Sequence, residues 1–279
     1  MKLGLFAVNE GPCLDPEVAS GVARQAEAAG FESLWVGEHV VLPDPRVAPS
    51  PMEPTDPIHD PLISLSYLAA VTTKVLLGTG IIILPQRNPL VLAKQIASLD
   101  VLSNGRVIFG IGAGYLQPEF EAVGVPFANH GPRTDEHLAA MRALWSEERP
   151  SFSGRFVNFS NVNAYPRPVQ KLVHTVVGGR SPAALKRSVE QAHGWYGYRL
   201  DHDATRTIMD AIRQTESDYQ RPTELGKLEI SITPPRMTLD ADAVRRYADL
   251  GVDRLVIRPW GIHSPDDLTR FVEQTAALG

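Results

Sequence analysis

Two apolar runs joined by a helical segment constrain the fold of this chain more than any other feature. The runs are Val75–Leu84 and Val107–Gly112, and both are rich in Val, Ile and Leu without alternation, as is typical of strands buried on both faces. Between them, Pro89–Leu102 carries apolar residues at helical spacing, with Asn88 as the expected N-cap and Pro89 at the first helical position. This pattern predicts two parallel strands joined by a right-handed crossover.

The same alternation of strand and helix patterns extends along the whole chain. Strands are expected at 2–8, 33–37, 75–84, 107–112, 174–177, 193–197, 227–233 and 254–257, and helices at 15–29, 62–73, 89–102, 134–145, 182–192, 203–219, 240–250 and 264–278. Eight such units predict one (β/α)8 TIM-barrel domain that spans residues 1–279. A doubly wound open sheet is the alternative, but it calls for fewer units and a GxGxxG turn after the first strand, where this chain has Val8-Asn9-Glu10-Gly11-Pro12.

Two long loops and one excursion interrupt the repeat. Residues 42–61 hold seven prolines and no periodicity, and residues 116–133 form a second loop. Long loops in compact domains are usually functional or mobile. Thr134 is expected to cap the helix that follows the second loop. Residues 151–170 are expected to form an excursion, such as a hairpin, between the fourth and fifth strands.

Composition excludes several classes of function. The net charge of −5 argues against nucleic acid or an anionic membrane as the main partner. No run approaches the roughly 18 apolar residues of a membrane helix, and the N-terminus lacks the apolar region of a signal peptide. The single cysteine, Cys13, cannot form an internal disulfide, which fits a reducing cytoplasm. HxH, HExxH, GxSxG and Walker motifs are all missing, so neither a metal site nor a serine nucleophile is expected.

The clearest local signal for a ligand is the segment Gly178-Gly179-Arg180-Ser181-Pro182. In a TIM barrel the active site lies at the C-terminal ends of the strands, and this segment follows the fifth one. Two glycines before a capped helix leave N–H groups at the positive end of the helix dipole, which suits a phosphate. Arg180 and the Ser181 hydroxyl are further donors. An ordinary tight turn with a good N-cap explains the same residues, and both interpretations stay open.

His39, directly after the second strand, is the candidate for acid/base chemistry or substrate contact because histidine titrates near neutrality. The alternative is a packed or solvent-facing loop histidine, which a single histidine favours. Glu38 is expected to be structural, and Trp195 and Trp260 to fill the barrel rim rather than stack on a ligand. Other polar or aromatic residues that follow expected strands are Asn9, Glu10, Gln86, Arg87, Tyr115, Tyr196, Tyr198, Arg236 and Arg258.

At these residues the sequence resembles the luciferase-like monooxygenase superfamily. It is most similar to the actinobacterial branch that uses the deazaflavin coenzyme F420. The resemblance covers nearly the whole chain and rests on these segments: EAAGFESLWVGEHVVLP, LLGTGIIILPQRNPLVLAKQIASLDVLSNGRVIFGIGAGYLQPEFEAVGVPF, RTDEHLAAMRALW, YPRPVQ and VVGGRSPAAL. It implies a (β/α)8 barrel that holds an isoalloxazine-like ring at its C-terminal mouth.

The resemblance also implies roles for individual residues. His39 would face the ring or the substrate, and a non-prolyl cis peptide at Gly80–Ile81 would form a bulge under the ring. The glycine turn after the fifth strand would hold the cofactor phosphate, and the segment after the fourth strand would line the same phosphate and the ribityl chain. Together with the helix start, the implied cofactor-binding residues are Gly80, Ile81, Gly112, Ala113, Gly114, Gly178, Gly179, Arg180 and Ser181.

The chain departs from the sugar-phosphate dehydrogenases of the superfamily at three points. They place a glutamate proton donor after the fourth strand, where this chain has Tyr115, and a tryptophan after the histidine, near Pro43 here. Their lysines for the substrate phosphate have no clear match. These departures disfavour a sugar phosphate as the substrate and leave the proton donor unassigned.

The resemblance therefore implies an oxidoreductase that moves a hydride between coenzyme F420 and an unidentified small organic substrate, with His39 and Tyr115 as catalytic candidates. The first alternative is an FMN-dependent monooxygenase, and the second is a flavin- or deazaflavin-binding protein without turnover. A metal-dependent hydrolase is disfavoured because the ligand motifs are missing. Family members are often homodimers, although no sequence feature fixes the oligomeric state of this chain.

Overall fold

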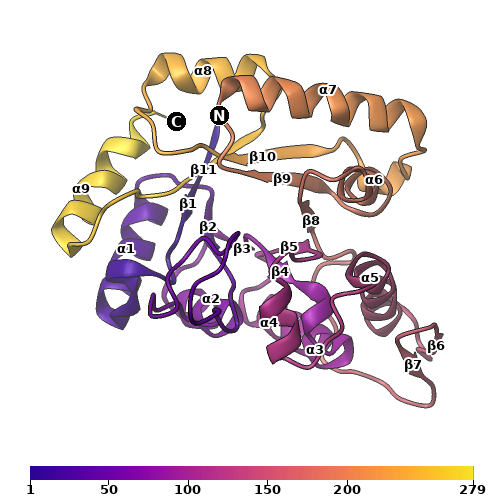
Figure 1. Cartoon of the computed structure of the whole chain (residues 1–279). Helices are drawn as coiled ribbons and strands as arrows, with labels where there is room; N and C mark the ends of the chain where they lie inside the picture. Colours follow the sequence, from indigo (N-terminus) through magenta and orange to yellow (C-terminus); the bar gives the residue numbers. More distant parts are fainter. Residues whose placement is uncertain (279) are drawn as a thin grey trace.

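Eight parallel strands close into a barrel in the computed structural model, which describes residues 1–278 (Figure 1). The hydrogen-bonded order is β3, β2, β1, β11, β10, β9, β8, β5, and pairing of β3 with β5 closes the ring. The strands are β1 (Lys2–Phe6), β2 (Ser33–Val36), β3 (Leu76–Thr79) continued by β4 (Ile82–Ile83), β5 (Val107–Gly112), β8 (Thr175–Gly178), β9 (Gly194–Tyr198), β10 (Glu229–Thr233) and β11 (Arg254–Ile257). The predicted TIM barrel is confirmed.

Helices alternate with the strands, and those at Pro89 and Pro182 begin at the caps that the sequence indicates. The Asn88 side chain accepts hydrogen bonds from the N–H groups of Leu90 and Val91, and the Ser181 side chain accepts one from Ala184. The helices are α1 (Pro16–Ala28), α2 (Pro61–Val71), α3 (Pro89–Leu102), α5 (His130–Ser146), α6 (Pro182–Gln191), α7 (His202–Asp218), α8 (Ala241–Asp249) and α9 (Pro265–Ala276).

The loop between β5 and α5 contains more structure than expected. The short helix α4 (Gln117–Ala122) lies within it, with Pro118 in its first turn. Helix α5 begins at His130 rather than at Thr134, so the predicted Thr134 cap is wrong. Thr134 lies inside the helix, where its hydroxyl donates to the His130 carbonyl at 2.7 Å. Pro132 is tolerated in the first turn because its missing N–H has no intrahelical acceptor there.

The predicted excursion between the fourth and fifth barrel strands is a hairpin. Strand β6 (Phe152–Ser153) pairs antiparallel with β7 (Asn158–Phe159). Figure 1 shows this hairpin projecting from the barrel beyond α5. It therefore lies apart from the strand ends at which a barrel site forms.

The third barrel strand is not continuous, in contrast to the single strand expected over residues 75–84. It breaks between β3 and β4 at Gly80–Ile81, whose peptide bond is cis, as the resemblance implies. Glycine is required at the break, because a Cβ atom on Gly80 would lie 2.8 Å from the Phe6 ring. A 3-10 turn (Leu84–Gln86) follows β4 and leads to α3.

The inside of the barrel is filled by aromatic side chains. Trp35 is fully buried and stacks on Tyr196, with ring centroids 5.4 Å apart. Glycines on both neighbouring strands make room for it, since Cβ atoms on Gly4 and Gly78 would lie 2.8 and 2.6 Å from its indole. The barrel is thus a packed core, and a ligand can reach it only from an end.

Candidate active site

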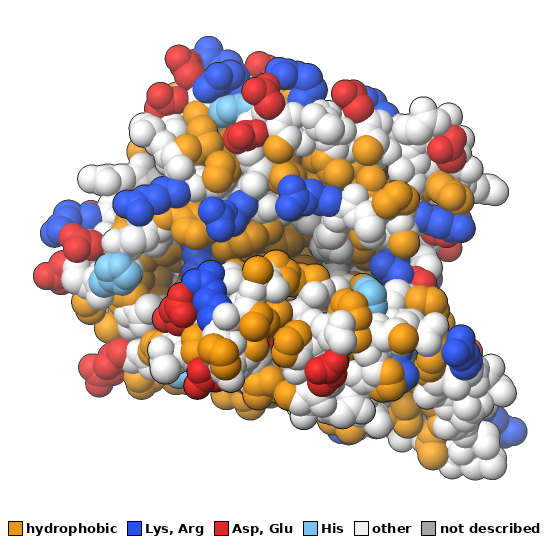
Figure 2. Space-filling view, viewed as in Figure 1, with side chains coloured by type: hydrophobic (Ala, Val, Ile, Leu, Met, Phe, Trp, Pro, Cys, Tyr) orange, Lys and Arg blue, Asp and Glu red, His pale blue; other side chains and the backbone are white. Residues whose placement is uncertain are grey.

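The mouth of the barrel, formed by the C-terminal ends of the strands and the residues after them, is a cleft with two different edges. Figure 2 shows Lys and Arg side chains in a row along one edge, over the strands β8 to β11, and mostly hydrophobic or uncharged side chains along the other. Such a cleft matches the usual position of active sites in TIM barrels.

The floor of the mouth is made of glycines and Ile81. A Cβ atom on Gly112 would lie 2.7 Å from Ile81 Cδ1, and one on Gly178 would lie 3.0 Å from Ile81 Cγ2. The Ile81 side chain therefore lies against both glycines, and three strands that are distant in sequence meet at this point. The structure thus brings together Gly80, Ile81, Gly112 and Gly178, four of the residues predicted to bind the cofactor. Glycine at positions 112 and 178 therefore makes room for the Ile81 side chain, which forms the floor of the mouth.

The glycine turn after β8 is held in place by a buried tryptophan. Trp195 Nε1 donates to the Gly179 carbonyl at 2.8 Å, so Trp195 anchors the turn rather than stacking on a ligand. Gly179 has a φ angle of +117°, which only glycine adopts without strain. Both Arg180 and Ser181 are exposed, and the Ser181 hydroxyl caps α6 by accepting from the Ala184 N–H at 3.2 Å. The turn therefore presents backbone and α6 dipole to the solvent side.

His39 is bound to a buried carboxylate that sequence reasoning missed. Its Nδ1 lies 3.3 Å from Glu119 Oε2, and the other Glu119 oxygen accepts from the Val40 N–H at 2.7 Å. The His39 side chain is 9% exposed and that of Glu119 is fully buried. Among residues 1–278, His39 Nε2 has no hydrogen-bond partner, so the carboxylate orients the ring and leaves this nitrogen for a ligand.

Tyr115 lies beside this pair, with its ring edge-on to His39 at a centroid distance of 6.4 Å. Burial raises the pKa of the Tyr115 phenol to about 12, and the nearby Glu119 carboxylate adds to the rise. Half of the residue's surface nevertheless remains exposed. The phenol is therefore neutral at physiological pH, where it can donate a hydrogen bond but cannot act as a base.

Glu38, which precedes His39, belongs to the framework of the site. Arg87 binds the buried Glu38 carboxylate through Nε at 2.7 Å and through Nη2, and its Nη2 also donates to Asp60 at 2.7 Å. The Ile83 N–H donates to the same Glu38 carboxylate. Asp60 in turn caps α2. This network joins the ends of β2 and β4 to the start of α2 and fixes the loop that carries His39.

Arginines gather around Trp260 on the opposite side of the mouth. Arg258 lies 4.9 Å from the centre of the Trp260 ring system and Arg199 lies 5.4 Å from it. Arg236 packs beside Gly261, where a Cβ atom would lie 3.3 Å from its guanidinium. Arg258 pairs with Glu10 and donates to the Tyr198 hydroxyl at 2.9 Å. The sequence placed Arg236 and Arg258 at strand ends, but nothing in it indicated that they meet at the segment Trp260–Gly261.

The residues of the mouth fit a phosphorylated ring coenzyme. In residues 1–278, Arg180, Arg199 and Arg236 have no carboxylate within salt-bridge distance. Both polar atoms of the Gln86 amide, just after β4, are buried without a hydrogen-bond partner in the same part of the chain. Unpaired buried polar atoms are rare in proteins and are usually completed by water or a ligand. Glycine backbone, free cations and an unsatisfied amide together suit a large anionic ligand.

No group of three or more His, Cys, Asp or Glu side chains within residues 1–278 is arranged to hold a metal ion. In the same range, no helix has the length and apolar character needed to cross a membrane.

Comparison with known proteins agrees with this architecture. The sequence model of the luciferase-like monooxygenases matches residues 1–262. An uncharacterised protein of Mycobacterium tuberculosis (strain H37Rv) is 32% identical over 292 residues, covering 99% of this chain and 98% of the relative. The F420-dependent glucose-6-phosphate dehydrogenase of Kineococcus radiotolerans is 30% identical over 295 residues, covering 98% of this chain and 80% of the relative. A crystallised F420-dependent secondary alcohol dehydrogenase shares the fold, with a TM-score of 0.79 at 17% identity and coverage of 100% and 99%.

The family match and the relatives together define an oxidoreductase that uses a deazaflavin or flavin coenzyme. The chain belongs to the luciferase-like monooxygenase family.

Proposed function

We propose that this protein transfers a hydride between coenzyme F420 and a small organic substrate. The observation that carries the proposal is the glycine floor around Ile81, which lies between the Gly179 turn and the His39–Glu119 pair. The relative from Kineococcus, which uses F420 and aligns with nearly the whole chain, supports the deazaflavin over FMN. Its sugar-phosphate substrate is not carried over, because Tyr115 stands where the related dehydrogenases have a glutamate.

Each part of the mouth has a role in this proposal. The bound coenzyme supplies the redox chemistry, and the protein supplies position and electrostatics. Backbone N–H groups at the start of α6 and the Arg180 guanidinium bind the phosphate. Ile81 supports the ring from below. His39 would hold or pass a proton at Nε2, because Glu119 fixes the orientation of its ring.

Binding of F420 and of FMN, measured side by side, tests the coenzyme assignment. Ser181→Asp tests the phosphate position, because aspartate caps a helix as well as serine does but adds a negative charge. Gly179 is less suitable for this purpose, since any side chain there would be strained at its φ of +117°. We expect Ser181→Asp to weaken F420 binding by at least about tenfold, whereas Ser181→Asn, a neutral cap, keeps binding within about threefold.

The outcomes separate the three classes of function. Tight FMN binding with weak F420 binding, or transfer of an oxygen atom to an organic substrate in the presence of reduced FMN and dioxygen, would favour the monooxygenase. Tight F420 binding without hydride transfer to any alcohol, aldehyde or ketone offered would favour a binding protein. If the Ser181→Asp and Ser181→Asn variants bind F420 with equal affinity, the phosphate does not bind at the start of α6.

A further inference from the structure

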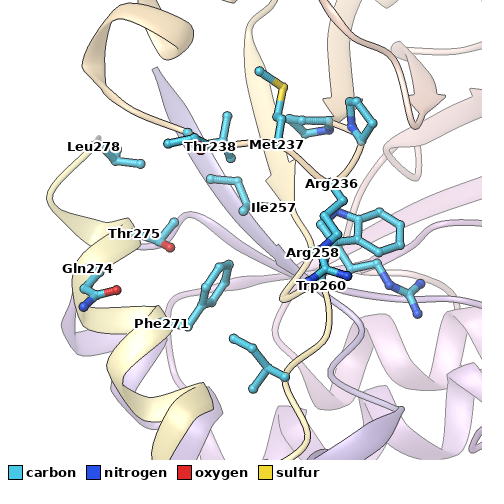
Figure 3. Close-up of a pocket in the computed structure, with 14 residues that line it drawn as sticks. Arg236, Met237, Thr238, Ile257, Arg258, Trp260, Phe271, Gln274, Thr275 and Leu278 are labelled. Atoms are coloured by element: carbon cyan, nitrogen blue, oxygen red, sulfur yellow. The ribbon is translucent and has the colours of Figure 1, made fainter.

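A second cavity lies next to the mouth, outside the barrel wall. Its volume is about 510 Å3, and it lies between the segment after β10, the end of β11 and one face of α9. Figure 3 shows Phe271, Gln274 and Thr275 of α9, with Leu278 just after it, on one side and Arg236, Arg258 and Trp260 on the other. The arginines and Trp260 therefore separate this cavity from the mouth, and the coenzyme proposal does not use it.

The lining of this cavity is mostly apolar. Ile257 and Phe271 face the cavity across its width, and Met237, Leu239, Ile262 and Leu278 add further apolar surface. A volume of this size and an apolar lining with a few polar groups are typical of sites for small organic molecules. Burial of apolar groups would supply most of the binding free energy.

The charged groups of the lining all have the same sign. Arg236 and Arg258 line the cavity, and no acidic side chain is among its lining residues. Arg258 is already paired with Glu10, whereas Arg236 is exposed and has no carboxylate partner within residues 1–278. A guanidinium at the edge of an apolar cavity selects a ligand that carries one anionic group on an apolar body.

We propose that this cavity binds a small organic acid, with its apolar body between Ile257 and Phe271 and its anionic group on Arg236. The head group is a carboxylate or a phosphate ester, since a guanidinium binds either. Because Arg236 and Trp260 also belong to the rim of the mouth, an acid bound here would lie beside the reacting centre. Binding can be measured without coenzyme, so the result is independent of the proposed hydride transfer.

Calorimetric titration of the full chain with three eight-carbon probes tests this site. We expect octanoate or octyl phosphate to bind at least about tenfold more tightly than octylamine, and the ratio of the two acids identifies the head group. Arg236→Gln should weaken binding of the acids by at least about fivefold. Gln274→Trp should also weaken binding of the acids, because the larger side chain on α9 would fill the cavity. Arg270→Gln, which removes an exposed arginine of the same helix outside the cavity, should leave binding unchanged.

Three results would overturn the proposal. They are no detectable binding of either acid, equal binding of octylamine, and acid binding that survives Gln274→Trp. The last result would place the acid in the mouth rather than in the cavity. All variants change exposed side chains, and circular dichroism confirms that they remain folded.

Discussion

The two sides of the mouth differ in how their charges are satisfied. On the side of β1 to β5, the buried carboxylates Glu38 and Glu119 are each bound by a cation or histidine and by a backbone N–H. On the side of β8 to β11, Arg180, Arg199 and Arg236 are exposed and lack carboxylate partners among residues 1–278. Buried charges need partners, while exposed cations are free to meet a ligand. The first side therefore holds His39 in a fixed orientation, and the second is suited to recognise an anion.

The largest effect is expected from breaking the network on the first side. Arg87→Ala leaves the buried Glu38 carboxylate without its cation, which typically costs roughly 3–5 kcal/mol of folding free energy. Arg199→Ala, on the second side, is the matched control and should change stability by less than about 0.5 kcal/mol. Urea unfolding of the two variants measures the difference. A similar free energy of unfolding for the two variants would show that the two sides of the mouth do not differ in how much their charged groups contribute to stability.

The next effect concerns the His39–Glu119 pair. His39→Ala should lower kcat by about 100-fold, which is typical for loss of a proton-transfer group, and change F420 affinity by less than about threefold. Glu119→Gln keeps the shape of the side chain but removes its charge, so it should lower kcat by a smaller factor. Steady-state kinetics with an accepted substrate gives kcat for each variant, and coenzyme titration gives its F420 affinity. A fully active His39→Ala variant would remove this residue from the mechanism.

The smallest effect is expected at Tyr115. Its pKa is raised to about 12, so the phenol stays protonated from about pH 6 to about pH 10. Tyr115→Phe should then lower kcat only a fewfold and leave every inflection of the pH–rate profile in that range in place. Loss of an inflection in the variant would mean that Tyr115 titrates during turnover, contrary to its burial beside Glu119.

The barrel could be predicted because its strands are short apolar runs and its helices carry clear caps. Asn88, Asp60 and Ser181 all cap the helices that they precede. Because His39 directly follows the second expected strand, its location at the mouth could also be predicted. The break at Gly80–Ile81 could not be read from the apolar pattern, because the residues on both sides of it are as apolar as a continuous strand requires. It was expected only from the family resemblance.

The parts of the site that escaped prediction depend on contacts between distant segments. Glu119 lies on α4, a helix of six residues in which only a proline near the start signals helix, and its partner is 80 positions away. The convergence of Arg199 and Arg258 on Trp260, with Arg236 beside the next residue, Gly261, needs three barrel strands to be in register. No local sequence pattern indicates these contacts between distant segments. The charge difference between the two sides of the mouth can be derived only when the order of the strands in the closed barrel is known.

The packing of Trp35 between Gly4 and Gly78 has a consequence for engineering this protein. The three residues occupy three adjacent strands and leave no space for a single side-chain enlargement. Mutant libraries that enlarge one of them at a time are expected to yield mostly destabilised clones, whereas replacing Trp35 with a smaller residue together with changes at both glycines can repack this part of the barrel. Directed evolution toward bulkier substrates is therefore best confined to the mouth loops unless all three codons are randomised together.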